Sequence, residues 1–567
     1  MITAAHTDPH GGEFINLVVS EERAAILKDI AFNLPDIALN ERQLCDFEML
    51  ATGAFSPLTG FMTQADYEPV VDRMQLADGT LWPVPICLDV NRTTAKQLEA
   101  GQSVALRDPE GFLLGILHIA DIWPVDREKE ALRVAGTSDT GHPAVHYLMH
   151  ASGDFYVGGR LEVISLPIHP TFKSIRQTPL EVREIFRKLG WKRVVGFQTR
   201  QPIHRPQFEM TLNAMKDARA NLLLLPNAGP TFPGDFDYYT RVRCYRSMAH
   251  YYPPEAFVMN LLPQASRMLG PRDAVLHLII GKNFGCTHFI IGKGHASPDG
   301  GAYYADGDAA QVATAFSETI GVTTLAFEEL VYLPFEDAYK PRNEVSKTTD
   351  IISFSGNDIR KRIREGRSIP EWATFKEVVD QLQVTYPPPR KQGFTIFLTG
   401  LSGAGKSTVA RILYARFLEM GERPVTLLDG DIVRRNLSSE LNFSKEHRDI
   451  NVRRIGFVAS EITKNRGVAI CAPIAPYAKT RAEIRNNIET YGGFIEVHVA
   501  TPLDICEKRD RKGMYAKARA GLIKGFTGVD DPYEVPEKSE LRIDTTSLTP
   551  DEAVHEILLY LGQRKFI

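Results

Sequence analysis

The segment 393–418 constrains the fold most, because it reads GFTIFLTGLSGAGKSTVARILYARFL: an apolar run, a glycine-rich turn and an amphipathic stretch. The turn has the spacing G-x-x-x-x-G-K-[ST], in which backbone N–H groups curl around phosphate oxygens where a Cβ would obstruct them. A helix that starts directly after the turn adds its positive N-terminal end. The pattern therefore predicts a strand, a phosphate-binding loop and a helix within an α/β domain.

Within this loop, Lys406 is expected to reach the β- and γ-phosphates, and the Ser407 hydroxyl is expected to ligate Mg²⁺. A glycine-rich turn that matches by chance is the alternative, but the apolar run and the helical pattern both lie where the mechanism needs them. The residues predicted to bind the nucleotide are Gly400, Leu401, Ser402, Gly403, Ala404, Gly405, Lys406, Ser407 and Thr408.

Two carboxylates follow the next predicted strand, in RPVTLLDGDIVRRNL. Asp429 and Asp431 could hold Mg²⁺ and accept a proton from an attacking hydroxyl, as phosphoryl transfer requires. They could also be residues that cap the following helix, and Asp431 could do both. Further along, Arg434, Arg448 and Asn451 could clamp an anionic acceptor or form a solvated helix face.

Composition restricts the class of protein. The chain has 567 residues, a net charge of −4 and a pI near 6.5, so no overall basic field favours nucleic acid. The six cysteines are widely spaced without a CxxC pair, which indicates reduced thiols and neither a disulfide framework nor a zinc site. The N-terminus is polar and no apolar run is long enough to span a membrane, so we expect a cytoplasmic protein that binds no membrane.

The pattern along the chain indicates several domains. Short β-type runs such as LWPVPICLDV, GQSVALRD and GGRLEVISLP predict a β-rich, barrel-like domain over 1–168. Strands then alternate with amphipathic helices, which predicts a parallel α/β domain over 169–330. Short helices predict a small helical subdomain and linker over 331–388, ending near the proline run TYPPPRKQGF. The P-loop domain occupies 391–567.

The P-loop domain resembles adenylylsulfate (APS) kinase over essentially all of 391–567. The motifs that carry the resemblance are LDGD, FIEV, TPLDICEKRD and KGMYAKARAGLIKGFTGVDDPYE. The resemblance implies transfer of the γ-phosphoryl group of ATP to the ribose 3′-hydroxyl of APS, which yields 3′-phospho-APS (PAPS). It makes Asp431 the base or hydroxyl-orienting carboxylate, with Asp429 beside it.

The same resemblance implies further binding residues. Phe443 and Phe526 would enclose the adenine of APS, and Arg509 would contact ATP. The family's DGDN reads DGDI here, with Ile432, and its FISPY reads PIAPY, with Ala475. The residues that the resemblance places against APS are Arg434, Phe443, Arg448, Asn451, Ile474, Lys517 and Phe526.

The first part of the chain, about 385 residues, resembles ATP sulfurylase (sulfate adenylyltransferase). The motifs are LCDFEMLATGAFSPLTGFM, PGDFDYYTRVRCY, GCTHFIIGKGHASP and SGNDIRKRIREG. The resemblance implies a PUA-like first domain, a Rossmann-like nucleotidyltransferase domain and attack of sulfate on the α-phosphorus of ATP. Catalysis would then consist of alignment and stabilisation of phosphate charge.

Several substitutions fall on the anion-facing loops of this second resemblance. The family loop QTRNPxHRAH reads QTRQPIHRPQ here, so Gln201 replaces asparagine and Gln207 replaces a histidine. Glutamine donates a hydrogen bond without a charge, and loss of one preorganised donor costs about 10²–10³ in rate. Other changes are Lys293, Gly294, Ser297 and Phe232. The residues that make up the sulfurylase-like site are Gln198, Thr199, Arg200, Gln201, His204, Gln207, Arg267, His295 and Ala296.

Three hypotheses follow. The first is an APS kinase fused to a sulfurylase domain whose activity is weak or absent, because the substitutions gather at one site. The second is a fully bifunctional PAPS synthase, and the third is a non-catalytic nucleotide-sensing protein, which the P-loop set disfavours. The expected ligands are ATP with Mg²⁺, APS and, for an active first domain, sulfate and pyrophosphate. The resemblance also suggests a homo-oligomer.

Overall fold

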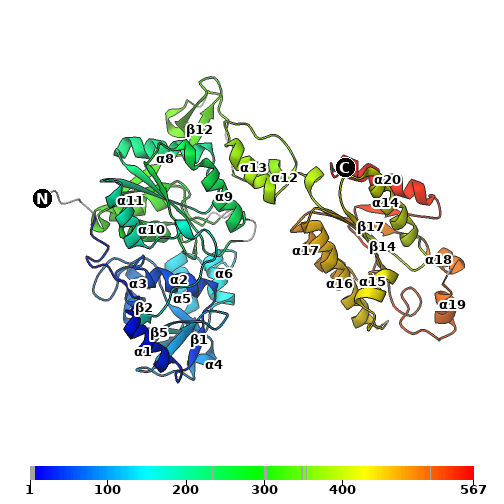
Figure 1. Ribbon diagram of the computed structural model, residues 1–567, viewed down its shortest axis with the longest axis horizontal. Helices are drawn as coiled ribbons and strands as arrows, with labels where there is room; N and C mark the ends of the chain where they lie inside the picture. Colours follow the sequence, from blue (N-terminus) through cyan, green and yellow to red (C-terminus); the bar gives the residue numbers. More distant parts are fainter. Residues whose placement is uncertain are drawn as a thin grey trace. The chain divides into compact units, whose positions relative to one another are not determined.

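The structure is a computed structural model that describes residues 7–232, 235–298, 303–346, 349–352, 354, 356–442, 444–510 and 512–567. The side chains of Asn357, Arg364 and Asp431 lie outside this description. The chain forms two compact units, one of Met1–Phe354 with Pro370–Gln381 and one of Ser355–Ile369 with Leu382–Ile567 (Figure 1).

The first unit begins with a six-stranded mixed sheet in the order β1-β4-β5-β6-β2, with β3 paired to β6. Its centre is the long antiparallel pair β5 and β6, while β1 runs parallel to β4. The strands are β1 (Asp36–Ala38), β2 (Gly60–Phe61), β3 (Leu88–Val90), β4 (Ser103–Arg107), β5 (Leu113–Pro124) and β6 (Phe155–Val163). The helices are α1 (Glu21–Ala31), α2 (Glu41–Ala51), α3 (Gln64–Arg73), α4 (Arg92–Ala95), α5 (Arg127–Glu130) and α6 (Pro143–His150).

A second, five-stranded sheet of the first unit is parallel throughout, in the order β11-β10-β7-β8-β9. The strands are β7 (Val194–Thr199), β8 (Asn221–Pro226), β9 (Phe257–Met259), β10 (His288–Gly292) and β11 (Thr323–Phe327). The helices are α7 (Pro179–Lys188), α8 (Arg205–Ala218), α9 (Tyr238–Met248), α10 (Pro271–Asn283) and α11 (Asp308–Ile320). Strand order reverses between β7 and β10, which is where such sheets bind ligands.

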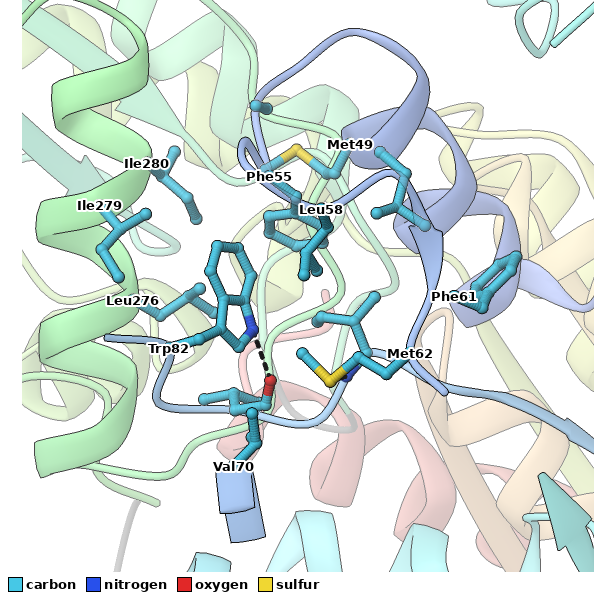
Figure 2. Packing of buried hydrophobic residues seen from close by; sticks show 14 of the residues in the cluster. Met49, Phe55, Leu58, Phe61, Met62, Val70, Trp82, Leu276, Ile279 and Ile280 are labelled. Carbon is cyan, nitrogen blue, oxygen red and sulfur yellow. Dashed lines mark hydrogen bonds between the residues drawn. The ribbon is translucent and has the colours of Figure 1, made fainter. Parts of the chain in front are cut away.

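One continuous apolar core includes residues from the domains of both sheets in this unit. Trp82 is fully buried between side chains of the first sheet region and of α10, and its indole N–H donates to the Val84 carbonyl at 2.8 Å (Figure 2). Leu276 and Ile280 of α10 belong to the same cluster as Phe55, which meets Trp82 edge-on. Burial of large side chains from both regions stabilises them as one body.

The stretch after β11 differs from the predicted helical subdomain, because it starts with an antiparallel hairpin of β12 (Leu330–Leu333) and β13 (Ala338–Pro341). The helices α12 (Gly356–Arg364) and α13 (Lys376–Thr385) follow. The proline run ends α13, as expected, since proline lacks the N–H that a helix requires.

The second unit contains a parallel five-stranded sheet in the order β15-β16-β14-β17-β18. Alternate residues of β14 face opposite ways. Phe394 and Ile396 join a cluster with α14 (Lys406–Met420) and α20 (Pro550–Gln563). Phe397 packs instead with α16 (Lys445–Lys464) and α17 (Ala478–Glu489). Helices therefore cover both faces of the sheet (Figure 1). The strands are β14 (Phe394–Thr399), β15 (Val425–Asp429), β16 (Val468–Ala472), β17 (Gly493–Val499) and β18 (Leu541–Ile543).

Helix boundaries in this unit follow local sequence signals. Ser444 caps α16 by accepting from the His447 N–H, and Thr549 and Glu552 form a reciprocal capping box at α20. The helices are α14 (Lys406–Met420), α15 (Gly430–Leu437), α16 (Lys445–Lys464), α17 (Ala478–Glu489), α18 (Leu503–Arg509), α19 (Met514–Arg519) and α20 (Pro550–Gln563). Among the residues described, no helix combines the length and the apolar character needed to cross a membrane.

Candidate functional site

The P-loop joins the carboxyl end of β14 to α14, next to the point where strand order reverses in the second unit's sheet. A Cβ on Gly400 would lie 2.5 Å from the Val499 carbonyl oxygen, so only glycine allows this approach of the loop to β17. Gly405, with φ +99°, turns the chain into the first residue of α14. Strand, loop and helix thus have the arrangement that the sequence predicts.

Lys406 is buried at the first position of α14. Its ammonium group donates to the carbonyls of Gly400 at 2.9 Å and Leu401 at 2.8 Å, inside its own loop. Burial lowers the pKa of Lys406 to about 8, opposed in part by Cys506 and Asp429. The loop therefore holds a cation at the position where phosphate oxygens would replace its own carbonyls.

Ser407 and Asp429 are the two residues predicted to ligate Mg²⁺. Ser407 is half-buried in the first turn of α14, and Asp429 is buried at the carboxyl end of β15. Hydroxyl and carboxylate oxygens are the donors that Mg²⁺ prefers, so this donor set fits that ion. Because α15 begins at Gly430, Asp431 belongs to its first turn, but the Asp431 side chain lies outside the described residues.

Residues of the last third of the chain hold the P-loop by hydrogen bonds to its backbone carbonyls. The Tyr515 hydroxyl donates to the Ser402 carbonyl at 3.0 Å, and the Thr545 hydroxyl donates to the Ala404 carbonyl at 3.0 Å. Arg509, predicted to contact ATP, donates to the Thr545 hydroxyl at 2.7 Å. Tyr515 and Thr545 were not identified from the sequence, because single hydroxyls far from the loop carry no local signal.

Arg448, one of the residues predicted to bind APS, is buried and held by three side chains. Its guanidinium donates to the Thr527 hydroxyl at 2.6 Å, to the Tyr477 hydroxyl at 3.0 Å and to the Asp531 carboxylate at 2.8 Å. Asn451, nearly one turn later on α16, is also buried, and its Oδ1 accepts no hydrogen bond within the described part of the chain. An unsatisfied buried amide oxygen suits a site that takes a polar ligand.

The remaining predicted APS residues differ in exposure. Phe526 is buried and meets Tyr515 edge-on with ring centroids 5.0 Å apart, whereas Lys517 is exposed on α19. Arg434 is half-buried and points toward the Leu441 carbonyl at 3.4 Å. Phe443, the expected second wall for adenine, lies outside the described residues, so its pairing with Phe526 stays a prediction.

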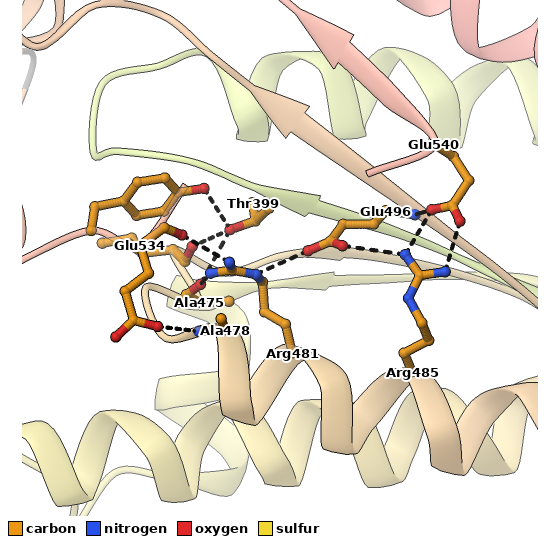
Figure 3. Close-up of polar contacts among 10 residues, drawn as sticks. Thr399, Ala475, Ala478, Arg481, Arg485, Glu496, Glu534 and Glu540 are labelled. Atoms are coloured by element: carbon orange, nitrogen blue, oxygen red, sulfur yellow. Dashed lines mark hydrogen bonds and ion pairs between the residues drawn. The ribbon is translucent and has the colours of Figure 1, made fainter. Parts of the chain in front are cut away.

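Ile474, also predicted to bind APS, contacts the P-loop strand through its backbone carbonyl. Its carbonyl accepts from the Thr399 hydroxyl at 2.6 Å and from the Gly400 N–H at 3.3 Å, which ties the loop 473–477 to the start of the P-loop. Figure 3 shows the polar contacts that continue from Thr399 and Ala475 to Arg481. Ile474 and Ala475 were named from the sequence, but their contacts with Thr399 and Arg481 were not identified there.

The sulfurylase-like site lies at the other reversal of strand order, in the first unit. Strand β7 ends at Thr199 and the neighbouring parallel strand β10 ends at Gly292. The segment with Arg200 and His204 and the segment with His295 and Ala296 therefore leave adjacent carboxyl ends. The fold brings together two stretches about 90 residues apart, which is what the alternating strand and helix pattern predicts.

The loop after β7 is held by one carboxylate. Asp235 forms an ion pair with Arg200, and its other oxygen accepts from the Gln201 amide at 2.6 Å. The Tyr245 hydroxyl donates to the Gln201 carbonyl at 2.7 Å and fixes the same turn. Thus Gln201, the residue in place of the family's asparagine, has a structural partner in this fold.

Gln207 caps a helix. It is the third residue of α8, and its Oε1 accepts from the His204 backbone N–H at 3.2 Å. The His204 ring lies buried, with Nδ1 2.9 Å from the Thr374 hydroxyl. The capping role accounts for a glutamine at this position independently of any anion.

Two other predicted residues of this site are also engaged by the protein. The Gln198 amide donates to the Gln264 side chain at 2.7 Å. Arg267 is 3% exposed and donates to the Asp46 carboxylate at 2.7 Å. Asp46 lies on α2 of the β-rich domain. The buried charge of Arg267 in the parallel α/β domain is therefore neutralised by a carboxylate of the neighbouring β-rich domain.

His295 is half-buried beside the buried His277, with Nε2 of His295 2.7 Å from Nδ1 of His277. Burial lowers the pKa of each ring to about 3, so both imidazoles are neutral near pH 7. Lys293, in place of the family's arginine, forms an exposed ion pair with Asp306 at 3.0 Å. Ala296, with φ +52°, accepts from the Gly270 N–H at 3.0 Å, which fixes the turn.

The chain matches three family models in succession. Residues 7–166 match a PUA-like domain, residues 173–385 match ATP-sulfurylase and residues 392–544 match adenylylsulphate kinase. These matches confirm the predicted fold class.

Several proteins resemble the chain over nearly its full length. A sulfate adenylyltransferase of Phaeosphaeria nodorum is 48% identical, with 98% of each chain covered, and one of Mycosarcoma maydis is 46% identical, with 99% of each covered. A solved structure, a hexameric APS kinase from Thiobacillus denitrificans, is 41% identical with a TM-score of 0.81 and 99% of each chain covered.

These comparisons bear on the expected weakness of the first domain. Relatives spanning the whole chain carry the name of the sulfurylase reaction, and nothing in the comparisons indicates that this domain is weak or inactive. They favour the bifunctional alternative over the main prediction. The chain belongs to the family in which a PUA-like domain and an ATP-sulfurylase domain are fused to an adenylylsulphate kinase domain.

Proposed function

We propose that the protein converts sulfate to PAPS in two steps, each consuming one ATP. The first unit joins sulfate to the α-phosphorus of ATP, forming APS and releasing pyrophosphate. The second unit then phosphorylates the 3′-hydroxyl of APS, forming PAPS and ADP. The observation that carries the proposal is the presence of both family domains in one chain, with relatives covering both.

For the kinase step, the P-loop binds the ATP phosphates and Lys406 follows the β- and γ-phosphates. Arg448 and Asn451 bind APS from α16, with Arg434, Ile474, Lys517, Phe443 and Phe526 as further contacts. Asp431 orients the 3′-hydroxyl and takes its proton as the oxygen attacks the γ-phosphorus. Buried, prearranged donors make the site suited to charge stabilisation without large reorganisation.

Mg²⁺ would be held by Ser407 and Asp429, whose oxygens fit it, and when bound it would neutralise charge on the phosphates. Arg509 supports the loop through Thr545, whose hydroxyl bonds the Ala404 carbonyl.

For the sulfurylase step, the residues at the carboxyl ends of β7 and β10 align ATP and sulfate. Arg200 supplies a cation, His204 supplies a hydrogen-bonding ring, and His295 supplies a neutral one. Gln198, Thr199 and Ala296 contribute polar groups and backbone at the same edge. No covalent intermediate is needed, because sulfate attacks phosphorus directly and pyrophosphate leaves.

A second candidate function is an APS kinase whose sulfurylase step is weak or absent. The observation that favours it is the state of the first site, where Asp235 engages both Arg200 and Gln201 and where Gln207 caps α8. Residues that act as a unit lose activity together, so these features could lower the rate substantially.

Two assays on the full chain decide between these functions. We expect pyrophosphate release with ATP and sulfate, and ADP release with ATP and APS. ADP release alone would support the second candidate. In that case Gln207→His should raise the rate of sulfate-dependent pyrophosphate release if the loop after β7 is the cause of the low activity. Absence of ADP release with APS would overturn the kinase assignment itself.

The protein is further proposed to be a cytoplasmic homo-oligomer that binds neither nucleic acid nor membrane. Support comes from the net charge of −4 and from the hexameric assembly named for the Thiobacillus denitrificans structure. Sedimentation equilibrium of the purified chain would measure the assembly.

A further inference from the structure

We propose that Arg481 of α17 is a positioning residue for the APS side of the kinase site. This inference rests on the proposed kinase function. Arg481 is 4% exposed, and its charge lies where three segments of the second unit meet. Neither the sequence pattern nor a family motif quoted above includes it.

The guanidinium of Arg481 fastens two loops to each other. It donates to the Ala475 carbonyl at 2.7 Å and to the Glu534 carbonyl at 2.8 Å (Figure 3). Ala475 has φ +47°, a left-handed conformation that costs energy for a residue with a Cβ. The bond to its carbonyl helps to hold that conformation.

These two loops close a ring of contacts with the P-loop strand. The Thr399 hydroxyl lies 3.0 Å from the Tyr533 hydroxyl and donates to the Ile474 carbonyl at 2.6 Å. The Glu534 N–H donates to the Pro476 carbonyl at 2.9 Å. Arg481 thus spans a ring that runs from Thr399 through the segment 474–476 and back through 533–534.

The same two loops carry the partners of Arg448. Tyr477 is the last residue of the first loop, 473–477, Asp531 is the first residue of the second, 531–534, and both contact the Arg448 guanidinium. The Ala478 N–H also donates to the Glu534 carboxylate at 2.6 Å. Movement of either loop would therefore shift the partners of Arg448 and the carbonyl of Ile474, both on the proposed APS side.

A chain of charges sets the direction of Arg481. Glu496 of β17 contacts Arg481 Nε at 3.0 Å and Arg485 at 3.2 Å. Glu540 in turn accepts from both terminal nitrogens of Arg485, at 2.7 and 2.8 Å, and from the Glu496 N–H at 2.7 Å (Figure 3). Since Glu496 is buried, its two arginines are needed to balance its charge.

Besides the hydrogen bond between Gly400 and Ile474, the P-loop has anchors that do not involve Arg481 or its two loops. Thr399 pairs with His498 in the register of β14 and β17, and the loop rests on Tyr515 and Thr545. Loss of the Arg481 fork should therefore loosen the segments 473–477 and 531–534 while the ATP side keeps its position. A positioning role therefore predicts weaker APS binding with unchanged ATP binding, whereas a general structural role predicts that both weaken.

The test is Arg481→Lys in the full chain, assayed for ADP release at varied APS and varied ATP. Lysine keeps the charge but lacks the planar fork, so it cannot hold both carbonyls and Glu496 together. We expect the KM for APS to rise roughly ten- to hundredfold, because small misplacements of binding groups have effects of that size. The KM for ATP should change little.

Glu540→Gln provides a second variant, because it keeps the shape and weakens only the outermost link to Arg485. It should raise the KM for APS in the same direction but less. Arg453→Lys is the matched control: Arg453 forms an exposed ion pair with Glu483 at 2.8 Å on the same unit, and its replacement should leave both KM values unchanged.

Equal increases in both KM values, or an unchanged KM for APS with only a lower unfolding temperature, would overturn the inference. Amide hydrogen exchange provides a readout apart from activity: Arg481→Lys should speed exchange in 473–477 and 531–534 more than at Ala404, whose N–H donates to the Leu401 carbonyl within the P-loop. If wild-type protein forms no ADP from APS, the proposed function fails, and the exchange pattern alone then decides the positioning role.

Discussion

Lys406 shows how burial alters a single side chain at the centre of the kinase site. Its ammonium group has left water and lies against two carbonyls of the P-loop. Burial disfavours the charged form, which is why its pKa is lowered to about 8. The type of residue was evident from the motif, but its protonation range depends on tertiary burial.

The first prediction concerns this pKa. Phosphates bind the protonated amine, so the affinity for a non-hydrolysable ATP analogue should fall as pH rises through about 8. One pH unit above a pKa leaves about a tenth of the group charged, so the loss by pH 9 should be about tenfold. Titration calorimetry at pH 7 and pH 9 would measure it.

Lys406→Arg is the control, because arginine stays charged over this range. The affinity of this variant for the ATP analogue should not fall between pH 7 and pH 9, whether it is higher or lower than that of the wild type. Parallel pH profiles for the two proteins would show that another group controls binding.

At the scale of elements, the shape of the P-loop depends on its close approach to β17 at Gly400. Sequence predicted the strand, loop and helix correctly, since periodicity and glycine spacing are local signals. The run LWPVPICLDV was predicted as a strand, yet only Leu88–Val90 is one, because pairing with β6 begins there. The hairpin of β12 and β13 was missed for the converse reason, as its two short strands carry little periodic pattern.

Gly400→Ala is the prediction at this scale. The added Cβ would lie 2.5 Å from the Val499 carbonyl oxygen, so the loop must move away from β17. We expect loss of most ATP binding and of ADP formation, with retained secondary structure by circular dichroism. The loss should reach about hundredfold, since alignment of phosphate-binding groups is what the loop supplies.

Gly562→Ala is the matched control for this change. Gly562 lies near the end of α20, and a Cβ there would meet nothing within 4 Å. Alanine favours helix over glycine by up to about 1 kcal/mol, so this variant should be as active as wild type and no less stable. Full ATP binding by Gly400→Ala would contradict the proposed close approach.

At the scale of the whole molecule, the chain divides into two compact units, each with a parallel sheet and a site at a reversal of strand order. In the first unit, Asp46 of the β-rich domain and Arg267 of the nucleotidyltransferase domain form a buried ion pair at 2.7 Å. Both side chains are nearly inaccessible to solvent, so removal of one charge leaves the other buried without compensation.

Asp46→Asn should therefore destabilise the first unit by about 3–5 kcal/mol. Thermal unfolding followed by calorimetry would measure the change. ADP formation from APS should persist at temperatures below unfolding, because the kinase site belongs to the other compact unit. The control is Asp72→Asn, which breaks an exposed pair with Lys129 and should cost less than about 1 kcal/mol.

A result in which both variants unfold alike would show that the Asp46–Arg267 pair contributes no more than a surface contact. Loss of kinase turnover in Asp46→Asn at low temperature would instead show that the two units depend on each other.

The sequence by itself determined the order of the domains, the P-loop and the residue types of both sites. These features are encoded in short motifs and in periodicity, which act over a few residues. The tertiary structure alone decided which of those residues are already engaged: Gln207 caps α8, Asp235 holds Arg200, and Asp46 balances Arg267. It also revealed Arg481, whose partners lie up to 53 residues away along the chain. Such partnerships depend on which distant backbone segments meet, and no local pattern records that.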